Sequence, residues 1–230
     1  MLRTGIVAVL LALELVLHYT SYPTFSLVMQ FIIVGYFIWW YFTERKSRFN
    51  YADKLLITST IISVFSPLTQ YIPNFFIANA VKFTVLSLSF VLMIIMFRNE
   101  GAKISFANKT NIFLIFASYI FLPSAFFIVM IVPLTTTIVS VTIFLYLLPM
   151  LYMVVLSTFL PYSEKGKLLI SLAMFVVILS SGVNSYRQYV TPFIFDYAFV
   201  RIFTTAFRVF MLFAMIDRID VRRNQSDYLD

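Results

Sequence analysis

The stretch of sequence that decides the fold is FIFDYAFVRIFTTAFRVFMLFAMID, residues 193–217, the last long apolar segment of the chain. Within it, Arg201 and Arg208 lie about two α-helical turns apart. One helical face would carry both guanidinium groups with small and hydroxylated residues, and the other the aromatic rings: Tyr197, Ala198, Thr204 and Thr205 on the first, Phe199, Phe203, Phe210 and Phe213 on the second. An arginine in hydrocarbon costs about 2.5 to 3.5 kcal/mol on insertion scales, so it normally faces a bundle interior or a wet cavity. We therefore expect this helix to form one wall of a polar site inside a membrane protein.

The composition is that of a multi-pass membrane protein. Of the 230 residues, 61% are hydrophobic and 12% are charged, and the mean hydropathy is +0.93. The chain has no cysteine and one histidine. Disulfides, thiolate catalysis and metal sites built from cysteines or several histidines are thereby excluded, and we expect neither a metal nor any other cofactor.

Apolar runs separated by charged residues, Pro or Asn predict an all-α bundle of eight transmembrane helices. We predict the spans at about 4–21, 25–42, 54–71, 75–97, 111–132, 135–160, 167–186 and 195–217. They would form one transmembrane domain over residues 1–217, followed by a short polar tail over 218–230.

Basic residues alternate between the predicted connections. Most of the 17 lysines and arginines fall at the two ends of the chain and in every second loop, namely Arg3, Arg45, Lys46, Arg48, Lys54, Arg98, Lys103, Lys109, Lys165, Lys167, Arg218, Arg222 and Arg223. The other set of loops holds only Arg187. By the positive-inside rule, we expect both termini and the tail to be cytoplasmic. The net charge of +7 is then topological, and we expect no nucleic-acid partner.

Five ionisable residues fall inside the predicted spans: Glu14, His18, Lys82, Arg201 and Arg208. At about 1.5 Å of rise per residue, all five lie between the midplane and the outer surface of the membrane. We therefore expect a shared cavity between the first, fourth and eighth spans that opens outward. One carboxylate faces three cations there, so the cavity would carry an excess of positive charge.

An anion is the natural complement of such a cavity. Arginine binds phosphate or carboxylate through a planar fork, whereas lysine supplies a point charge. We predict that the cavity binds an anionic membrane lipid or lysolipid through Arg201, Arg208, Lys82, Thr204 and Thr205. Glu14 would balance charge or act as a general base, with His18 one turn away on the same helical face.

A purely structural alternative exists for the same residues. Glu14 would pair with one cation to fix helix packing, and the other two cations would reach the surface or bond to backbone carbonyls. His18 alone is more typical of a membrane interface than of catalysis. We expect the amides Asn79 and Gln30 to bond between helices.

The length, the eight-span plan and the last two spans resemble the YhhN family of membrane proteins, which includes lysoplasmalogenases. The similarity is best over residues 167–217, where GKLLISLAMFVVILSSGVNS (166–185) precedes a charged outer loop and the helix from Tyr197 to Met215. The resemblance implies cleavage of the alkenyl ether bond of lysoplasmalogens. It also implies catalytic aspartates in a Gly-Asp pair on the third span and a Ser-Asp pair on the seventh.

This chain departs from the family pattern at those positions. It has Ser66-Pro67 and Ser180-Ser181 where the two pairs fall, and Ser87 where a histidine is often found in the fourth span. Hydroxyl groups cannot replace two carboxyl groups that shuttle a proton and activate water. We expect lipid binding to be kept, and hydrolysis only if Glu14 and His18 supply the acid and base.

A second hypothesis belongs to another class: an accessory or sensor subunit without chemistry of its own. The absence of paired acids favours it, as does the basic tail over 218–230, which could dock a protein partner in the cytoplasm. A transporter is disfavoured because the two halves of the chain show no matching broken segments.

Overall fold

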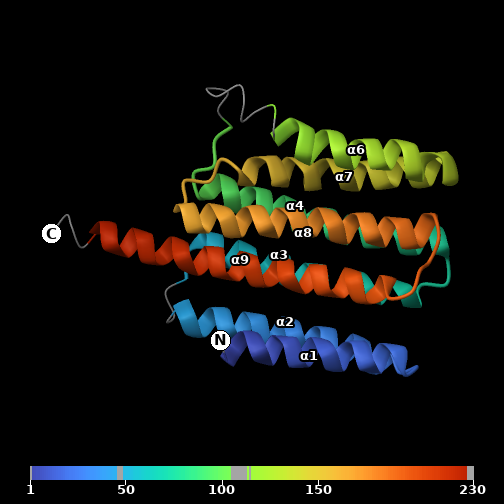
Figure 1. Ribbon diagram of the computed structural model, residues 1–230, viewed down its shortest axis with the longest axis horizontal. Coiled ribbons are helices and arrows are strands. Elements are labelled where there is room, and N and C mark those ends of the chain that lie inside the picture. Colours follow the sequence, from blue (N-terminus) through green and yellow to red (C-terminus); the bar gives the residue numbers. More distant parts are fainter. Residues whose placement is uncertain (1, 46–48, 105–112, 114, 227–230) are drawn as a thin grey trace. The chain divides into compact units, whose positions relative to one another are not determined.

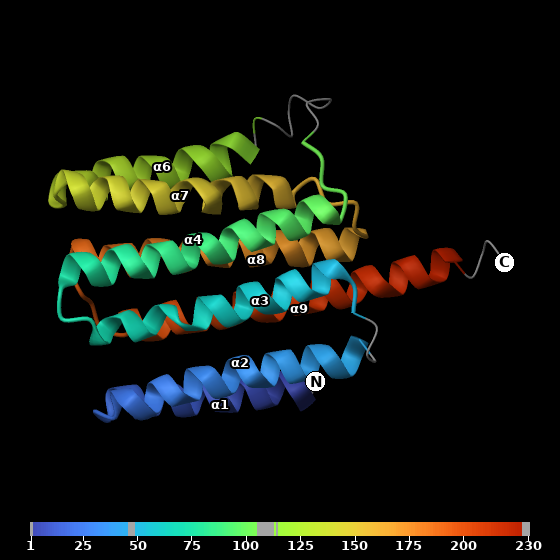
Figure 2. The same cartoon turned by 180° about the vertical axis from the view of Figure 1, so that it is seen from behind.

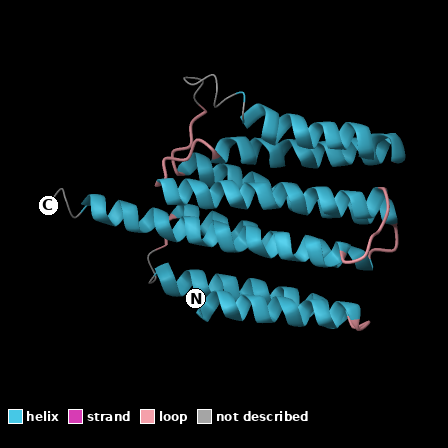
Figure 3. Cartoon of the chain, viewed as in Figure 1, coloured by secondary structure: helices cyan, strands magenta, loops and turns pink. Residues whose placement is uncertain are grey.

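The computed structural model describes residues 2–45, 49–104, 113 and 115–226, and the regular structure within these ranges is entirely helical (Figure 1 and Figure 3). The all-α prediction is confirmed. The α-helices are α1 (Leu2–Tyr19), α2 (Pro23–Arg45), α3 (Tyr51–Val64), α4 (Phe75–Asn99), α6 (Leu122–Phe126), α7 (Thr137–Ser157), α8 (Glu164–Tyr189) and α9 (Asp196–Ser226). Seven stretches among the described residues are long and apolar enough to cross a membrane, so the chain is a multi-pass membrane protein by helix length and hydropathy.

The third predicted span, 54–71, is not one continuous α-helix. Helix α3 ends at Val64, and a 3-10 helix, η1 (Ser66–Tyr71), follows. Pro67 explains the break, because proline has no N–H to donate and disfavours the α conformation of the residue before it. At about 1.5 Å per α-helical residue and 2.0 Å per 3-10 residue, α3 and η1 together extend about 33 Å. That length matches a hydrocarbon core of about 30 Å, so the segment can still cross.

The fifth predicted span, 111–132, begins at residues 111 and 112, which lie outside the described part of the chain. From Phe116 onward it consists of two π-helical turns, η2 (Phe116–Phe121) and η3 (Phe127–Ile131), on either side of α6, and a final 3-10 turn, η4 (Val132–Leu134). Pro123 lies in the first turn of α6, where its missing N–H interrupts the α-helical ladder. The widened turns next to it are typical of π-bulges in membrane helices.

The chain divides into two compact units. Unit one contains residues 1–49, 161–180 and 198–230, and unit two contains 50–160 and 181–197. Unit one therefore holds α1, α2, the first part of α8 and nearly all of α9. Unit two holds α3, η1, α4, the α6 region, α7 and the end of α8.

In unit one, α1 and α9 are antiparallel. Glu14 contacts Arg201, and Tyr19 contacts Ala198, so the end of α1 lies beside the beginning of α9. The beginning of α1 lies beside the end of α2, because Arg3 forms an ion pair with Glu44. Figure 1 shows the two helices side by side.

The opposite end of unit one collects basic residues. Lys165, at the beginning of α8, pairs with Asp217 near the last described side chains of α9. Trp40, late in α2, packs edge-on against Phe213 of α9. The basic residues Arg3, Arg45, Lys165 and Arg218 thus lie at one end of the unit, as the alternating charges predicted.

Unit two also has basic residues at one of its ends. Ser59 of α3 and Ser89 of α4 exchange hydrogen bonds of 3.0 and 3.1 Å between antiparallel helices, which lie side by side in Figure 2. Helix α7 runs parallel to α4, since Phe83 packs on Tyr146 and Arg98 donates to Tyr152. Lys54, Arg98 and the end of α7 therefore share one end of the unit. Three further basic loop residues, Lys46, Arg48 and Lys109, lie outside the described residues.

The predicted polar tail over 218–230 is partly helical. Helix α9 continues to Ser226, so the first part of the tail prolongs the eighth span. Residues 227–230 lie outside the described part of the chain, and so do the side chains of Arg222 and Arg223.

Candidate functional site

The arginine face of α9 is buried in unit one. Arg201, Thr205 and Arg208 are 6%, 3% and 9% exposed, at the spacing of four and three residues that aligns side chains on one helical face. Phe199 and Ile202, on another face, are 45% and 44% exposed. The helix therefore turns its polar face inward and apolar side chains outward, as expected of a charged helix surrounded by lipid.

A buried ion pair joins the first and last helices of unit one. Arg201 donates from Nε and Nη2 to the two carboxylate oxygens of Glu14, at 2.5 and 3.0 Å. Glu14 is 0% exposed. A two-pronged contact of this kind is the strongest geometry available to arginine and carboxylate. The pair is the one foreseen by the structural alternative, and it fixes the packing of α1 against α9.

Arg208 adds a second buried cation to this pair. Its guanidinium lies close enough to interact electrostatically with both Arg201 and Glu14. Among the described side chains of unit one, Glu14 is the only buried carboxylate. We call Glu14, Arg201, Thr205 and Arg208 the arginine cluster. By formal charge, the cluster carries one positive charge in excess.

The two threonines predicted to bind a ligand have different surroundings. Thr204 Oγ1 lies 2.9 Å from Ser180 Oγ of α8, and Ser180 also donates to the backbone oxygen of Val200 at 3.3 Å. Thr204 is thus engaged in helix packing. Thr205 Oγ1 is buried and has no hydrogen-bond partner among the described residues. It lies between the two arginines in sequence and on the helical face that they share.

His18 lies one turn beyond Glu14 on α1 and is half-buried. Its ring packs edge-on against Tyr19, whose hydroxyl accepts a hydrogen bond from the backbone N–H of Ala198 at 3.4 Å. Both oxygens of Glu14 already accept from Arg201, so the carboxylate is held as an ion-pair partner. The catalytic pair of Glu14 and His18 stays a prediction, and the observed geometry favours a structural role for Glu14.

Lys82 belongs to unit two, where amide oxygens surround it. Its Nζ donates to Gln188 Oε1 at 3.2 Å and lies 3.5 Å from Asn184 Oδ1. Gln188 in turn donates from Nε2 to Asn79 Oδ1, which confirms that Asn79 bonds between helices. The convergence of Lys82 with the arginine cluster in one outward-opening cavity stays a prediction.

The polar residues of α8 were not among the predicted site residues. Asn184 and Gln188 are four residues apart and therefore share a helical face, which is the signal that could have indicated partners for Lys82. Ser180 and Ser181 were noted only as positions without aspartate. In the structure Ser180 bonds to Thr204 in unit one, and Ser181 lies 2.8 Å from the hydroxyl of Tyr146 in unit two.

No protein-family model, no curated protein and no solved structure matches the chain. The resemblance to YhhN proteins therefore stays a prediction.

Proposed function

We propose that this multi-pass membrane protein binds an anionic amphiphile, a lipid or lysolipid, at the arginine cluster of unit one. The observation that carries the proposal is the charge of the cluster: two buried arginines and one buried carboxylate. Arg201 is neutralised by Glu14, so a bound anion would be held by Arg208 with Thr205 beside it.

The energetics of buried charge support an anionic ligand. An ion removed from water costs several kcal/mol unless an opposite charge and hydrogen bonds compensate it. Glu14 is one carboxylate beside two guanidinium groups, so the formal charge of the cluster is positive. A phosphate or carboxylate head group would supply negative charge and accept from the forked guanidinium.

The membrane location favours an amphiphile over a free anion. Arg208 lies within a span of 23 residues, Asp196–Arg218, so a bound anion would be surrounded by apolar helices. The acyl chain of a lipid can lie among apolar helices beside its bound head group, whereas a free inorganic anion would have to give up its hydration shell to reach that depth. The resemblance to YhhN proteins points to a lysolipid within this class, and the basic ends of both units would face the cytoplasm.

The experiment is to identify what copurifies with the protein. The full chain would be extracted in a mild detergent without added lipid, and bound lipids would be measured by native mass spectrometry. We expect about one anionic lipid per protein, and at least a tenfold loss with Arg208→Gln, because a charged hydrogen bond contributes about 1.5 to 3 kcal/mol. Arg3→Gln, which removes an arginine at the surface of the same unit, is the matched control.

Equal lipid retention by the two variants would contradict the proposal. If Arg208→Gln and Arg3→Gln retain the same anionic lipids in the same amounts as the unchanged protein, Arg208 does not hold a head group. Elution as a single sharp peak in size-exclusion chromatography would show that each variant is folded.

One observation favours a second candidate function, that of an accessory or sensor subunit. Helix α9 continues past its predicted transmembrane end, from Arg218 to Ser226. This extension contains several charged residues and would project a helical docking element from the membrane. Crosslinking in native membranes would test it: a stoichiometric partner lost on truncation after Arg218 supports docking, and unchanged lipid retention by that truncation separates the two functions.

A further inference from the structure

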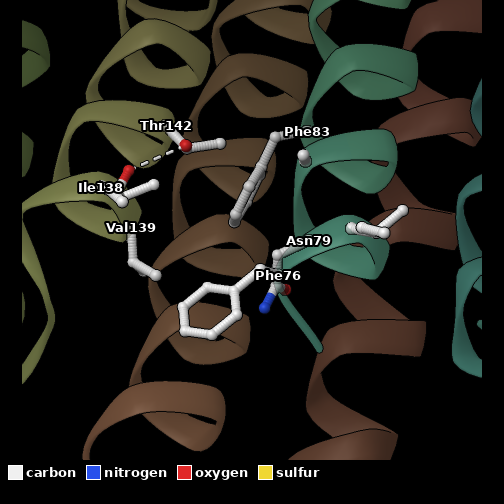
Figure 4. Close-up of a pocket in the computed structure, with 8 residues that line it drawn as sticks. Phe76, Asn79, Phe83, Ile138, Val139 and Thr142 are labelled. Atoms are coloured by element: carbon white, nitrogen blue, oxygen red, sulfur yellow. Dashed lines mark hydrogen bonds between the residues drawn. The ribbon is translucent and has the colours of Figure 1, made fainter. Parts of the chain in front are cut away.

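Unit two contains a groove between α4 and α7 that is independent of the arginine cluster. Its volume is ≈ 250 Å³, and its lining is apolar except for Asn79 and Thr142 (Figure 4). Phe83 at its base is 3% exposed, whereas Phe76 and Ile138 at its rim are 53% and 72% exposed. An apolar groove with an outward-facing rim on a membrane span would be filled by a lipid chain.

The two polar residues of the groove differ in whether their hydrogen-bonding groups have partners. Thr142 donates its hydroxyl to the backbone oxygen of Ile138 at 2.9 Å. Figure 4 marks this hydrogen bond with a dashed line. Asn79 is 5% exposed, and its Nδ2 is buried with no hydrogen-bond partner among the described residues. The groove therefore holds one hydrogen-bond donor that has no partner among the described residues. Burying such a donor in a lipid environment costs free energy, which a bound acceptor would recover.

Lys82 determines that this uncommitted group is a donor. The lysine ammonium has no lone pair to offer, so the atom of Gln188 that it contacts at 3.2 Å must be the amide oxygen. The amide nitrogen of Gln188 therefore faces Asn79 and requires the oxygen of Asn79 as its acceptor. The nitrogen of Asn79 is left on the side of the groove. Lys82 thus fixes the orientation of the Gln188 amide, and Gln188 in turn fixes that of the Asn79 amide.

The depth of Asn79 indicates the acceptor that would meet it. Helix α4 has 25 residues. At about 1.5 Å per residue it extends about 37 Å, or about 3 to 4 Å beyond each face of a 30 Å hydrocarbon core. Asn79 lies four residues, about 6 Å, from the beginning of α4, just inside the boundary of the core. The ester groups of glycerolipids lie at this level.

We propose that the groove between α4 and α7 binds one acyl chain of a membrane glycerolipid, whose ester carbonyl accepts a hydrogen bond from Asn79 Nδ2. Phe76, one turn before Asn79 on the same helix, lines the same groove and would lie beside the bound chain. The site requires no charged head group, which distinguishes it from the arginine cluster.

The test compares an ester lipid with an ether lipid. The full chain in mild detergent would be incubated with dioleoylphosphatidylcholine or with its dialkyl ether analogue, which lacks both carbonyls, and retained lipid would be counted by native mass spectrometry. We expect the ester lipid to be retained about three- to tenfold better, the effect of one hydrogen bond. Asn79→Leu should abolish the preference, and Lys82→Met should reduce it because the amides are then free to rotate.

Thr142→Val is the matched control. Its hydroxyl lines the same groove and is already bonded to Ile138, so the ester preference should be unchanged. Should Asn79→Leu fail to fold, Val139→Trp fills the groove, leaves the sequence at Asn79 unchanged and should lower the retention of both lipids. Equal retention of the two lipids by the unchanged protein overturns the proposal. Retention of neither lipid, with the mass of a dimer, overturns it in favour of a second copy of the chain.

Discussion

Arg201 holds both carboxylate oxygens of Glu14, and through this contact α9 is tied to α1 across 187 residues of sequence. Both side chains are withdrawn from lipid and water, at 6% and 0% exposure. A pair in this situation contributes little compared with two apolar residues, but breaking it leaves one ion buried without a partner. The pair therefore fixes which helices pack together more than it increases their stability.

A double-mutant cycle measures this contact. We expect Arg201→Gln and Glu14→Gln each to lower the free energy of unfolding by about 3 kcal/mol, because each leaves a buried charge. The double variant should lose much less than the sum, with a coupling energy of about 2 kcal/mol or more. Unfolding in increasing sodium dodecyl sulfate, followed by circular dichroism, gives these values.

The control is the pair of Arg3 and Glu44 in the same unit, whose side chains are 36% and 40% exposed. Its coupling energy should be at most about 1 kcal/mol, because water and ions screen an exposed pair. Equal coupling energies for the two pairs would show that Glu14 and Arg201 are not buried together.

Gly166, near the beginning of α8, lies close to the side chain of Asp217 of α9. A Cβ atom there would lie 3.2 Å from Asp217 Oδ2 and 3.3 Å from Ser163 Oγ, two atoms that bond to each other. We expect Gly166→Val to lower the free energy of unfolding by about 1 to 3 kcal/mol, the usual effect of overpacking. The same detergent titration would measure the loss.

Gly35 of α2 provides the matched control for this prediction. A Cβ atom at Gly35 would have nothing within 4 Å. Gly35→Ala should therefore stabilise the protein by up to about 1 kcal/mol, since alanine is the better helix former. A loss at Gly35 equal to that at Gly166 would mean that close contact with Asp217 and Ser163 does not explain the effect.

The hydrophobic pattern predicted most of the helices because each span must satisfy its own backbone within one segment. The position of the basic residues at one end of unit one was also predictable, because the basic residues that flank membrane spans concentrate on one side of the membrane. The break after Val64 was not predicted, although Ser66-Pro67 is visible in the sequence, because prolines inside membrane helices often leave the helix continuous.

The candidate site was only partly predictable. The seven-residue spacing of Arg201 and Arg208 indicated an inward-facing basic stripe, and both side chains are buried. Which cation pairs with Glu14 was not predictable, because periodicity gives the face of a helix and not its neighbour. The partners of Lys82 were also out of reach, since Asn184 and Gln188 lie more than 100 residues away in sequence.

Ser59 and Ser89 offer a test of how α3 holds to α4. Ser59 donates to the backbone oxygen of Ser89, and Ser89 donates to that of Ser59, both from buried positions. Replacing either by alanine should cost about 0.6 kcal/mol and at most about 1.7, the range measured for such bonds in membranes. Thr142→Val, whose hydroxyl bonds only within its own helix, is the control, and a larger loss there than at Ser59 would contradict this assignment.

One experiment can test on which side of the membrane the basic ends lie and whether the segment formed by α3 and η1 spans the membrane. The chain contains no cysteine that would interfere with labelling. Lys54→Cys and Tyr71→Cys place one thiol at each exposed end of the broken segment, and Lys165→Cys marks the basic end of unit one. If both basic ends are cytoplasmic, a membrane-impermeant maleimide should label Tyr71→Cys on intact cells, and the other two only after permeabilisation. The unchanged chain, which has no thiol, sets the background. Labelling of Lys54→Cys and Tyr71→Cys from the same side would mean that α3 and η1 enter and leave through one face, so that seven helices cross the membrane.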